Sequence, residues 1–204
     1  MSFADEITRW NDRFAGDDYH FGTEPNAFLA SQAQRLRAGS SVLCVADGEG
    51  RNSVWLAQRG LKVTAFDVSP VGVEKARRLA RAAGVTLESR AISVNDWDWD
   101  AAHYDAVVAI FIQFANPAER ERIFSGMIRA LAPGGLLILQ GYTPRQLEYR
   151  TGGPPFAEHL YTEALLREAF AALTTVVLRE YEDEVREGTG HSGHSALIGM
   201  VARR

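Results

Sequence analysis

The sequence predicts an α/β fold in which a mostly parallel sheet carries helices on both faces. Short apolar segments alternate with amphipathic segments along most of the chain, which is the order of repeated strand–helix units. One apolar segment, residues 42–45, ends in the loop Gly48-Glu49-Gly50 and leads directly into a helical pattern. This succession is typical of the nucleotide-binding start of an open sheet, although an ordinary strand-to-helix turn remains the alternative.

Composition limits the class of protein. The chain has 204 residues, 46% of them hydrophobic, and a net charge of −4. We expect one domain over residues 1–204, with a helical arm or cap at residues 1–38 and an α/β core at residues 39–204. The mild negative charge argues against nucleic acid as the main partner. We find no membrane-spanning run or leader pattern and expect a cytoplasmic protein without a membrane partner, whose oligomeric state the sequence leaves open.

The N-terminal arm shows two different patterns. Apolar residues recur at helical spacing at its start: Phe3, Ile7, Trp10 and Phe14. Residues 19–26 are rich in aromatic side chains, and a second helix is predicted over residues 23–39. Tyr19 and Phe21 are interpreted either as core packing or as an arm that closes over a ligand.

An acidic residue follows the second predicted strand. A helix from Asn52 to Gly60 leads to a strand over residues 61–66, and Asp67 comes next. A carboxylate at this position lies beside the glycine loop of a doubly wound sheet, where it accepts hydrogen bonds from both hydroxyls of a ribose. The alternative role is a helix N-cap, since Ser69 and Pro70 also indicate a helix start.

The rest of the chain continues the alternation and then changes character. We predict helices at residues 73–83, between 116 and 132, and at 162–173, and strands at residues 85–89, within 104–114, and at 136–139, 174–181 and 195–202. The last two strands are joined by residues 187–194 and form a hairpin. A hairpin places an antiparallel pair at the end of the parallel sheet.

Details of the loop region separate the possible cofactors. A dinucleotide site prefers Gly or Ala at the last position of Gly-x-Gly-x-x-Gly, which is Ser53 here, and the terminal hairpin also argues against it. For these reasons a nicotinamide-dependent oxidoreductase is the less favoured class of protein, and it is kept as the alternative. The single cysteine, Cys44, is interpreted as a buried small hydrophobic side chain rather than a nucleophile.

Several segments together resemble class I S-adenosylmethionine-dependent methyltransferases: VLCVADGEGRN at residues 42–52, Asp67, ALAPGGLLIL at residues 130–139, and the antiparallel last strand. Residues 19–26, 151–154 and 187–193 resemble, more narrowly, the small tellurite-resistance-like branch. The resemblance implies a Rossmann-like, seven-stranded sheet in the order 3-2-1-4-5-7-6 and S-adenosyl-L-methionine as cofactor. It also implies in-line methyl transfer to a small-molecule acceptor. A soft thiol, selenium or tellurium acceptor would need little help from a base.

The resemblance also implies the site residues. Those implied for the cofactor are Tyr19, Phe21, Ala46, Asp47, Gly48, Gly50, Asn52, Asp67, Val68, Ser93, Val94 and Ile110. Gln113 and His191 are the candidate catalytic residues, with His191 as an acid or base, and a hydrogen-bonded turn histidine is the alternative. His191 and His194 have the spacing of a metal pair but no third ligand, so we expect no metal.

Three positions depart from the family pattern. Many relatives have an acidic residue at Cys44, a glycine at Ala46 and an aspartate at Ser93, and these changes are expected to weaken cofactor binding without changing the class. A cofactor-binding protein without transferase activity is therefore a further alternative. Asn116-Pro117 lacks the rest of the Asn-Pro-Pro-aromatic signature of amino-methylating enzymes, so Asn116 is interpreted as a helix cap.

Overall fold

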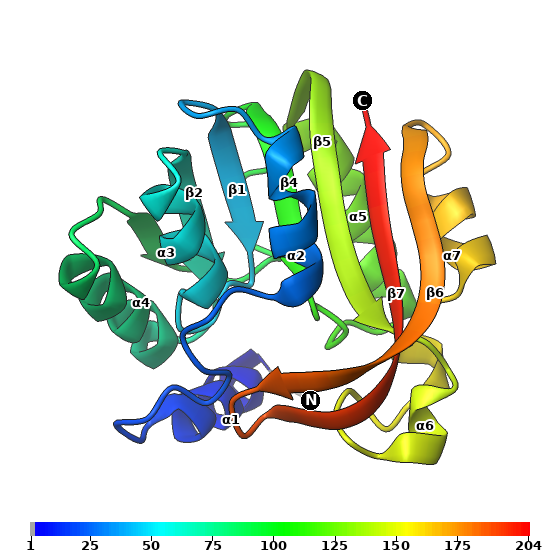
Figure 1. Ribbon diagram of the computed structural model, residues 1–204, viewed down its shortest axis with the longest axis horizontal. Helices are drawn as coiled ribbons and strands as arrows, with labels where there is room; N and C mark the ends of the chain where they lie inside the picture. The colour runs from blue at the N-terminus through cyan, green and yellow to red at the C-terminus, as the bar shows by residue number, and fades with distance from the viewer. Residues whose placement is uncertain (1–2) are drawn as a thin grey trace.

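A seven-stranded sheet forms the centre of the fold (Figure 1). The computed structural model describes residues 3–204, with side chains from residue 6 onward, so the predicted apolar contact of Phe3 lies outside the described part. The strands lie in the order β3-β2-β1-β4-β5-β7-β6, which confirms the predicted topology. Their bounds are β1 Ser41–Val45, β2 Lys62–Asp67, β3 Glu88–Ala91, β4 Tyr104–Ile110, β5 Leu131–Tyr142, β6 Thr174–Glu187 and β7 His191–Arg203.

Strand direction divides the sheet into two parts. The strands from β3 to β5 are parallel, whereas β7 is antiparallel to both β5 and β6. The β6–β7 hairpin is longer than predicted, because its strands remain paired as far as Glu187 and His191. The loop predicted over residues 187–194 is therefore wrong, and only residues 188–190 form the turn. This end of the hairpin has no face packed on the core, so its residues do not alternate between apolar and polar, and the sequence pattern did not indicate strands there.

The helices cover both faces of the sheet (Figure 1). Leu43 and Val45 of β1 share a core with α5 and α7, whereas Cys44 between them packs with α2 and α3. This alternation confirms that Cys44 is a buried apolar side chain, and burial raises the pKa of its thiol. The helical elements are α1 Phe3–Phe14, α2 Ala27–Gln32, η1 Ala33–Arg35, α3 Arg51–Gln58, α4 Pro70–Ala82, α5 Pro117–Ala130, α6 Gln146–Tyr149, η2 Ala157–His159 and α7 Glu163–Ala169.

Two predicted boundaries are wrong for identifiable reasons. The second helix begins after Asn26 rather than at Thr23, because the Asn26 side chain accepts the N–H of Leu29 and the residue before a proline avoids helical geometry. The third strand begins at Glu88 rather than Val85. The Val85 N–H bonds to the last turn of α4 instead of joining the sheet.

Other predicted helix starts agree with the structure. Asn116 caps α5 in a reciprocal capping box with Glu119, which confirms its interpretation as a cap. Ser69 and Thr162 cap α4 and α7. None of the helices in residues 3–204 combines the length and apolar composition needed to cross a bilayer.

Gly50 brings the loop after β1 close to α4. Its φ is +91°, and a Cβ placed there would lie 2.6 Å from the Cβ of Ala76. Glycine is therefore required both for the left-handed backbone and for the contact between the loop and the helix. The contact fixes where the loop leaves β1.

We predict that Gly50→Ala lowers the free energy of unfolding by about 2–5 kcal/mol, because left-handed strain and overpacking add. Gly39→Ala is the matched control, since Gly39 has φ +83° but no atom within 4 Å of an added Cβ. The control should lose only about 1–2 kcal/mol from strain. Urea denaturation measures both, and equal losses would contradict the packing role of Gly50.

Candidate functional site

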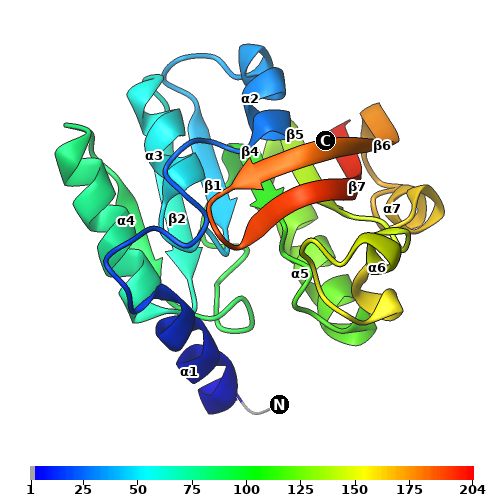
Figure 2. The same cartoon turned by 60° about the horizontal axis from the view of Figure 1, so that its bottom comes forward.

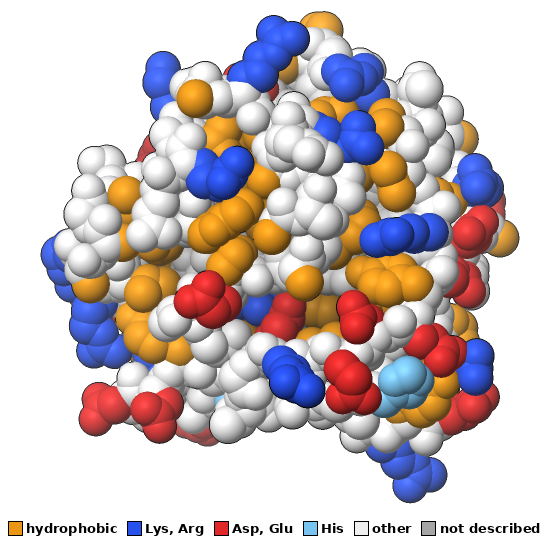
Figure 3. Space-filling model, in the orientation of Figure 1, with side chains coloured by type: hydrophobic (Ala, Val, Ile, Leu, Met, Phe, Trp, Pro, Cys, Tyr) orange, Lys and Arg blue, Asp and Glu red, His pale blue; other side chains and the backbone are white. Residues whose placement is uncertain are grey.

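The carboxyl ends of the parallel strands open into a cavity of about 550 Å³. Its walls come from the loop after β1, the ends of β2 and β4, the helix α1 and the tip of the β6–β7 hairpin. Figure 2 shows the hairpin curving over these strand ends toward the N-terminal segment. The backbone N–H groups of Thr189 and Gly190 both donate to the carbonyl of His20, which fixes this closure. Acidic and basic side chains are mixed on the face seen in Figure 3.

The structure gathers most of the predicted site residues around this cavity. Those that line it are Phe21, Ala46, Asp47, Gly48, Asn52, Asp67, Val68, Ser93, Val94, Ile110, Gln113 and His191. Tyr19 and Gly50 are not among the lining residues. Gly50 instead packs against α4, and the hydroxyl of Tyr19 donates to the carbonyl of Lys75 over 3.2 Å. The roles assigned to the lining residues stay predictions.

Asp67 connects two backbone segments at the floor of the cavity. One of its carboxylate oxygens accepts the N–H of Gly48 and the other accepts the N–H of Ser69, each over 2.9 Å. Ser69 is the N-cap of α4, so the alternative capping role of Asp67 is wrong. Burial raises the pKa of Asp67 to about 6 despite these two hydrogen bonds.

Asp47 places a second carboxyl group on the same side of the cavity. It accepts a hydrogen bond from the hydroxyl of Ser53. Burial raises the pKa of Asp47 to about 7, and the charge of Asp67 contributes in the same direction. Two neighbouring carboxyl groups with raised pKa values favour a cationic ligand, because a positive charge between them offsets the cost of ionising both.

The backbone is strained at Ala46, the position at which many relatives are expected to have a glycine. Ala46 has φ +48°, a left-handed conformation that costs a residue with a side chain about 1–2 kcal/mol. Beyond β3, the Ser93 side chain accepts the N–H of Asn95 over 3.1 Å and so shapes the loop that lines the cavity next to β2. Phe66 backs this wall by stacking on Trp97 at 4.3 Å.

The helix α1 lies over the cavity as a cover, and none of its residues was among the predicted site residues. Its side chains Arg9, Trp10 and Arg13 line the cavity, and Trp10 lies 6.4 Å from the ring of Phe21. Phe21 also contacts the ring of His191 at 4.5 Å. Of the two aromatic residues predicted to close over a ligand, only Phe21 has this position. The helical spacing had indicated an apolar face, without showing what it packs against.

A buried ion pair holds this cover on the glycine loop. The ammonium of Lys75 lies 2.5 Å from a carboxylate oxygen of Glu49 and also donates to the carbonyls of Gly16 and Asp18. The other Glu49 oxygen accepts the backbone N–H of His20 over 2.7 Å. Glu49 therefore connects the arm directly to the loop that follows β1.

Gln113 fixes the backbone on the opposite side of the cavity. Its amide oxygen accepts the N–H of Tyr142 over 2.6 Å, and its amide nitrogen donates to the carbonyls of Tyr142 and His159. Through these hydrogen bonds the side chain of Gln113 holds the end of β5 against the loop before α7. The geometry favours positioning rather than proton transfer by Gln113, and its catalytic role stays a prediction.

His191 lies at the hairpin side of the cavity with 9% of its surface exposed. Its Nδ1 is 3.4 Å from Glu187, and its ring contacts Phe21 and Phe111, each at 4.5 Å. Burial lowers the pKa of His191, and the opposing effect of Glu187 does not offset it. The imidazole is therefore neutral near pH 7 and has the protonation state of a general base.

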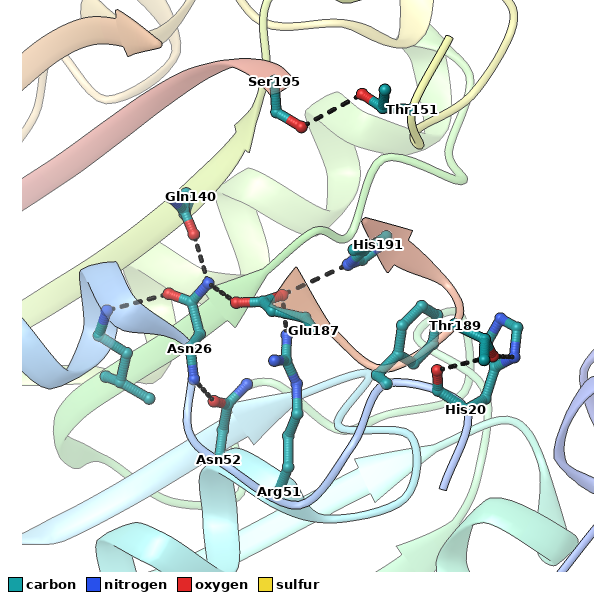
Figure 4. A network of polar contacts seen from close by, with 12 residues as sticks. His20, Asn26, Arg51, Asn52, Gln140, Thr151, Glu187, Thr189, His191 and Ser195 are labelled. Carbon is teal, nitrogen blue, oxygen red and sulfur yellow. Dashed lines mark hydrogen bonds and ion pairs between the residues drawn. The ribbon is translucent and has the colours of Figure 1, made fainter. Parts of the chain in front are cut away.

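Glu187 belongs to a polar network that motif reasoning did not find (Figure 4). Arg51 forms an ion pair with it at 2.6 Å, and the amide nitrogen of Asn26 donates to it over 2.8 Å. Burial alone would raise the pKa of Glu187, but His191 and Arg51 lower it to about 2. Asn26 also donates to Gln140, and its backbone N–H is accepted by the side chain of Asn52. Arg51 and Asn52 follow the glycine loop, and Asn26 and Glu187 lie in segments that carry the narrower resemblance, but no motif showed that these four residues meet.

The histidines of the hairpin lie in different surroundings. His194 is outside the cavity and lies 3.1 Å from Glu182, whereas His191 faces the interior. Within residues 3–204 as described, no three side chains of the types His, Cys, Asp and Glu come together as a metal-binding group.

The strand order and the cavity at the carboxyl ends of the strands give the chain the Rossmann-like fold of class I S-adenosylmethionine-dependent methyltransferases. Residues 42–135 match the family described as methyltransferase domain. The ubiquinone biosynthesis O-methyltransferase of Methylocella silvestris is 32% identical over 107 residues, which are 52% of this chain and 41% of that protein. The chain thus corresponds to less than half of this relative's length.

Two solved structures show how widely the fold is shared. A protein studied in the conversion of a disulfide bond into a thioacetal group during echinomycin biosynthesis matches with a TM-score of 0.78 at 20% identity, over 98% of this chain and 90% of that one. The N-methyltransferase NodS from Bradyrhizobium japonicum, in complex with S-adenosyl-L-homocysteine, matches with a TM-score of 0.71 at 17% identity, over 97% of both chains. The narrower tellurite-resistance-like branch stays a prediction.

The two raised carboxyl pKa values predict a pH dependence of stability. Between about pH 4 and pH 7 Asp47 and Asp67 bind more protons in the folded chain than in the unfolded chain, in which aspartate titrates near 3.8. The contribution of these two groups to the free energy of unfolding should therefore decrease as the pH rises through this range. We predict that Asp47→Asn is more stable than wild type at pH 8, by on the order of 4 kcal/mol, since one unit of pKa shift is worth about 1.4 kcal/mol and the pKa of Asp47 rises from 3.8 to about 7.

Thermal denaturation across this pH range measures the effect, and the advantage of Asp47→Asn should shrink toward pH 4. Asp17→Asn changes an exposed carboxylate and serves as the control, with the pH dependence of wild type expected. An unchanged pH dependence in Asp47→Asn would contradict the raised pKa of Asp47.

Proposed function

We propose that the chain transfers a methyl group from S-adenosyl-L-methionine to a small-molecule acceptor by in-line displacement. The observation that carries this proposal is the asymmetric cavity. Asp47 and Asp67 lie on the side of the glycine loop, whereas neutral His191 lies on the opposite side among aromatic rings. The first side suits a ligand with positive charges, and the second suits the atom that receives the methyl group.

The residues present fit this cofactor. S-adenosyl-L-methionine carries a sulfonium and an ammonium, and it supplies a methyl group that is already activated for transfer. Asp47 and Asp67 provide the carboxylates that such charges require, and Gly48 exposes backbone next to them. We assign the ribose to Asp67, because its two backbone hydrogen bonds leave carboxylate lone pairs for further donors.

The side chains around the second half of the cavity exclude water and orient the acceptor. Phe21 and Phe111 contact the two sides of His191, so the imidazole has little rotational freedom. Alignment of the acceptor with the transferred methyl can supply on the order of 7–11 kcal/mol. An oxygen or nitrogen acceptor would lose its proton to His191, whereas a soft sulfur, selenium or tellurium acceptor needs little base catalysis.

One structural neighbour favours sulfur among these acceptors, because that protein was studied in the conversion of a disulfide bond into a thioacetal group. A nicotinamide-dependent oxidoreductase is not favoured. Ser53, which replaces the last glycine of the dinucleotide pattern, donates to Asp47 and to the carbonyl of Gly50. Its hydroxyl thus fixes the loop in a shape with a carboxyl group toward the cavity.

Ligand-induced stabilisation tests the cofactor. At about 100 times its dissociation constant, S-adenosyl-L-homocysteine should add about 2.7 kcal/mol to the free energy of unfolding, which is a rise of several degrees in Tm. NADH should have no effect. Stabilisation by NADH but not by S-adenosyl-L-homocysteine would contradict the proposal. Tight binding without methyl transfer to any thiol, selenite or tellurite acceptor would instead favour a cofactor-binding protein without transferase activity.

We predict that His191→Gln lowers kcat for an oxygen or nitrogen acceptor by about 10²–10⁴-fold, the usual contribution of a positioned base. The dissociation constant of S-adenosyl-L-homocysteine should stay within about twofold. In wild type, activity should be flat above about pH 6.5 and fall at lower pH, because the pKa of His191 is lowered by burial.

His194→Gln is the matched control for this measurement. His194 lies on the same hairpin but is exposed and paired with Glu182, so its replacement should leave kcat unchanged. Equal activity of His191→Gln and His194→Gln would show that His191 is structural.

A further inference from the structure

Two buried hydrogen-bond donors in the cavity wall have no acceptor among the described residues. They are Nη1 of Arg51 and the hydroxyl of Tyr142. Arg51 is 7% exposed and Tyr142 only 1% exposed. A buried donor without a partner costs about 1–3 kcal/mol, so two such groups facing one cavity indicate a ligand.

One of these donors belongs to a side chain paired with Glu187, and the other belongs to a ring near His191. Nη2 of Arg51 is 2.6 Å from Glu187, which Figure 4 shows between Arg51 and His191. The ring of Tyr142 lies 5.7 Å from the ring of His191 and stacks on Phe111 at 4.6 Å. The pair Arg51 and Tyr142 thus borders the half of the cavity in which the acceptor is expected.

The chemistry of both groups selects an oxygen acceptor. Arginine only donates hydrogen bonds and stays charged. Burial raises the pKa of Tyr142, with a contribution from the charge of Glu187, so its hydroxyl keeps its proton and donates. A carboxylate accepts from a guanidinium and a phenol together, and charge-assisted bonds of this kind are the strong ones.

The charge in this half includes one ion pair, because Glu187 of β6 already neutralises one side of the Arg51 guanidinium. The carboxyl groups that line the cavity itself come from α1 and from the ends of β1 and β2, and no acidic residue lines it from β4, β5 or β7. Arg9 and Arg13 line the same cavity and have no carboxylate within 4 Å among the described side chains. Burial is the largest cause that lowers the pKa of His20 and of His191, and the positive charge of Arg13 lowers both further.

Aromatic side chains complete the wall of this half. Phe111 and Phe114 follow β4, and Phe156 lies 5.4 Å from the ring of His159 on the loop before α7. Phe156 is 56% exposed, so one apolar ring stands at the rim. These rings suit a flat apolar ligand.

We infer that Arg51 and Tyr142 form a carboxylate-binding subsite, and that the methyl acceptor is a small molecule with a flat apolar body and a carboxylate. The identification of the ligand as an acceptor rests on the proposed function. The subsite itself depends only on the two unpartnered donors.

Fluorine NMR with para-fluorobenzoate tests the subsite, with and without saturating S-adenosyl-L-homocysteine. Wild type should bind para-fluorobenzoate about tenfold or more tightly than the neutral para-fluorobenzamide, because hydrogen bonds to a charged group are the stronger ones. Tyr142→Phe and Arg51→Lys should each weaken benzoate binding about tenfold. Arg51→Lys keeps a positive charge near Glu187 but loses the free guanidinium nitrogen.

Tyr161→Phe is the matched control. The Tyr161 hydroxyl is also buried without a partner, but Tyr161 packs in the core and does not line the cavity. It should bind para-fluorobenzoate as wild type does. Tyr142→Phe should not have a lower Tm than wild type, because the lost hydroxyl makes no hydrogen bond in the protein.

Equal affinity of wild type for the benzoate and the benzamide, or no detectable benzoate binding, would overturn the inference. So would a loss of S-adenosyl-L-homocysteine affinity in Tyr142→Phe and Arg51→Lys with unchanged affinity for methylthioadenosine, which lacks the amino-acid tail. That result would show that the subsite holds the cofactor's own carboxylate. A failure of the proposed function is distinguishable, because S-adenosyl-L-homocysteine would then not bind wild type while the benzoate measurement without it remains valid.

Discussion

The ion pair between Lys75 and Glu49 is the constraint on which the closed cavity depends. Both side chains are almost fully buried, and a buried charge is tolerated only when it is paired and hydrogen-bonded. Lys75 meets this condition by donating also to carbonyls of the arm, and Glu49 meets it by accepting the N–H of His20. If the arm moved away from the glycine loop, Lys75 would lose its carbonyl acceptors and Glu49 would lose the N–H of His20, so the buried pair would lose the hydrogen bonds that offset its burial.

The second constraint joins the end of the chain to its beginning. Glu187 on β6 accepts hydrogen bonds from Arg51 after the glycine loop and from Asn26 before α2. Asn26 in turn binds Gln140 on β5. The hairpin is thereby fixed over the carboxyl ends of the parallel strands, and His191 at its start is held beside Phe21. Segments from three regions of the chain thus form one preorganised pocket, as catalysis by alignment requires.

Charge is distributed unequally within this pocket. Asp47 and Asp67 make the wall at the ends of β1 and β2 acidic, whereas Tyr142, the neutral His191 and the Arg51–Glu187 pair form a wall of donors and rings toward the hairpin. A cationic methyl donor and an acceptor with a carboxylate would each meet groups of complementary character. The same asymmetry separates binding of the cofactor from recognition of the acceptor.

Local patterns predicted most of the fold. The apolar run of β1, the position of Asp67 after β2 and the cap at Asn116 each depend on neighbours in sequence, and the structure has them where they were expected. The start of α2 and the extent of the hairpin were wrong, because contacts of Asn26 and the long β6–β7 ladder determine them. Of the site, the residues adjacent to strand ends were found, and Arg51, Tyr142 and the lining residues of α1 were not.

The sequence by itself determined the class of fold, the glycine loop and the acidic residue beside it, because periodicity and turn chemistry act over short distances along the chain. Only the tertiary structure decided that Phe21 rather than Tyr19 faces the cavity, that Gly50 packs on α4, and that two donors remain without partners. These properties arise from contacts between residues far apart in sequence. No local sequence pattern shows which buried polar group will receive a hydrogen bond from a distant segment.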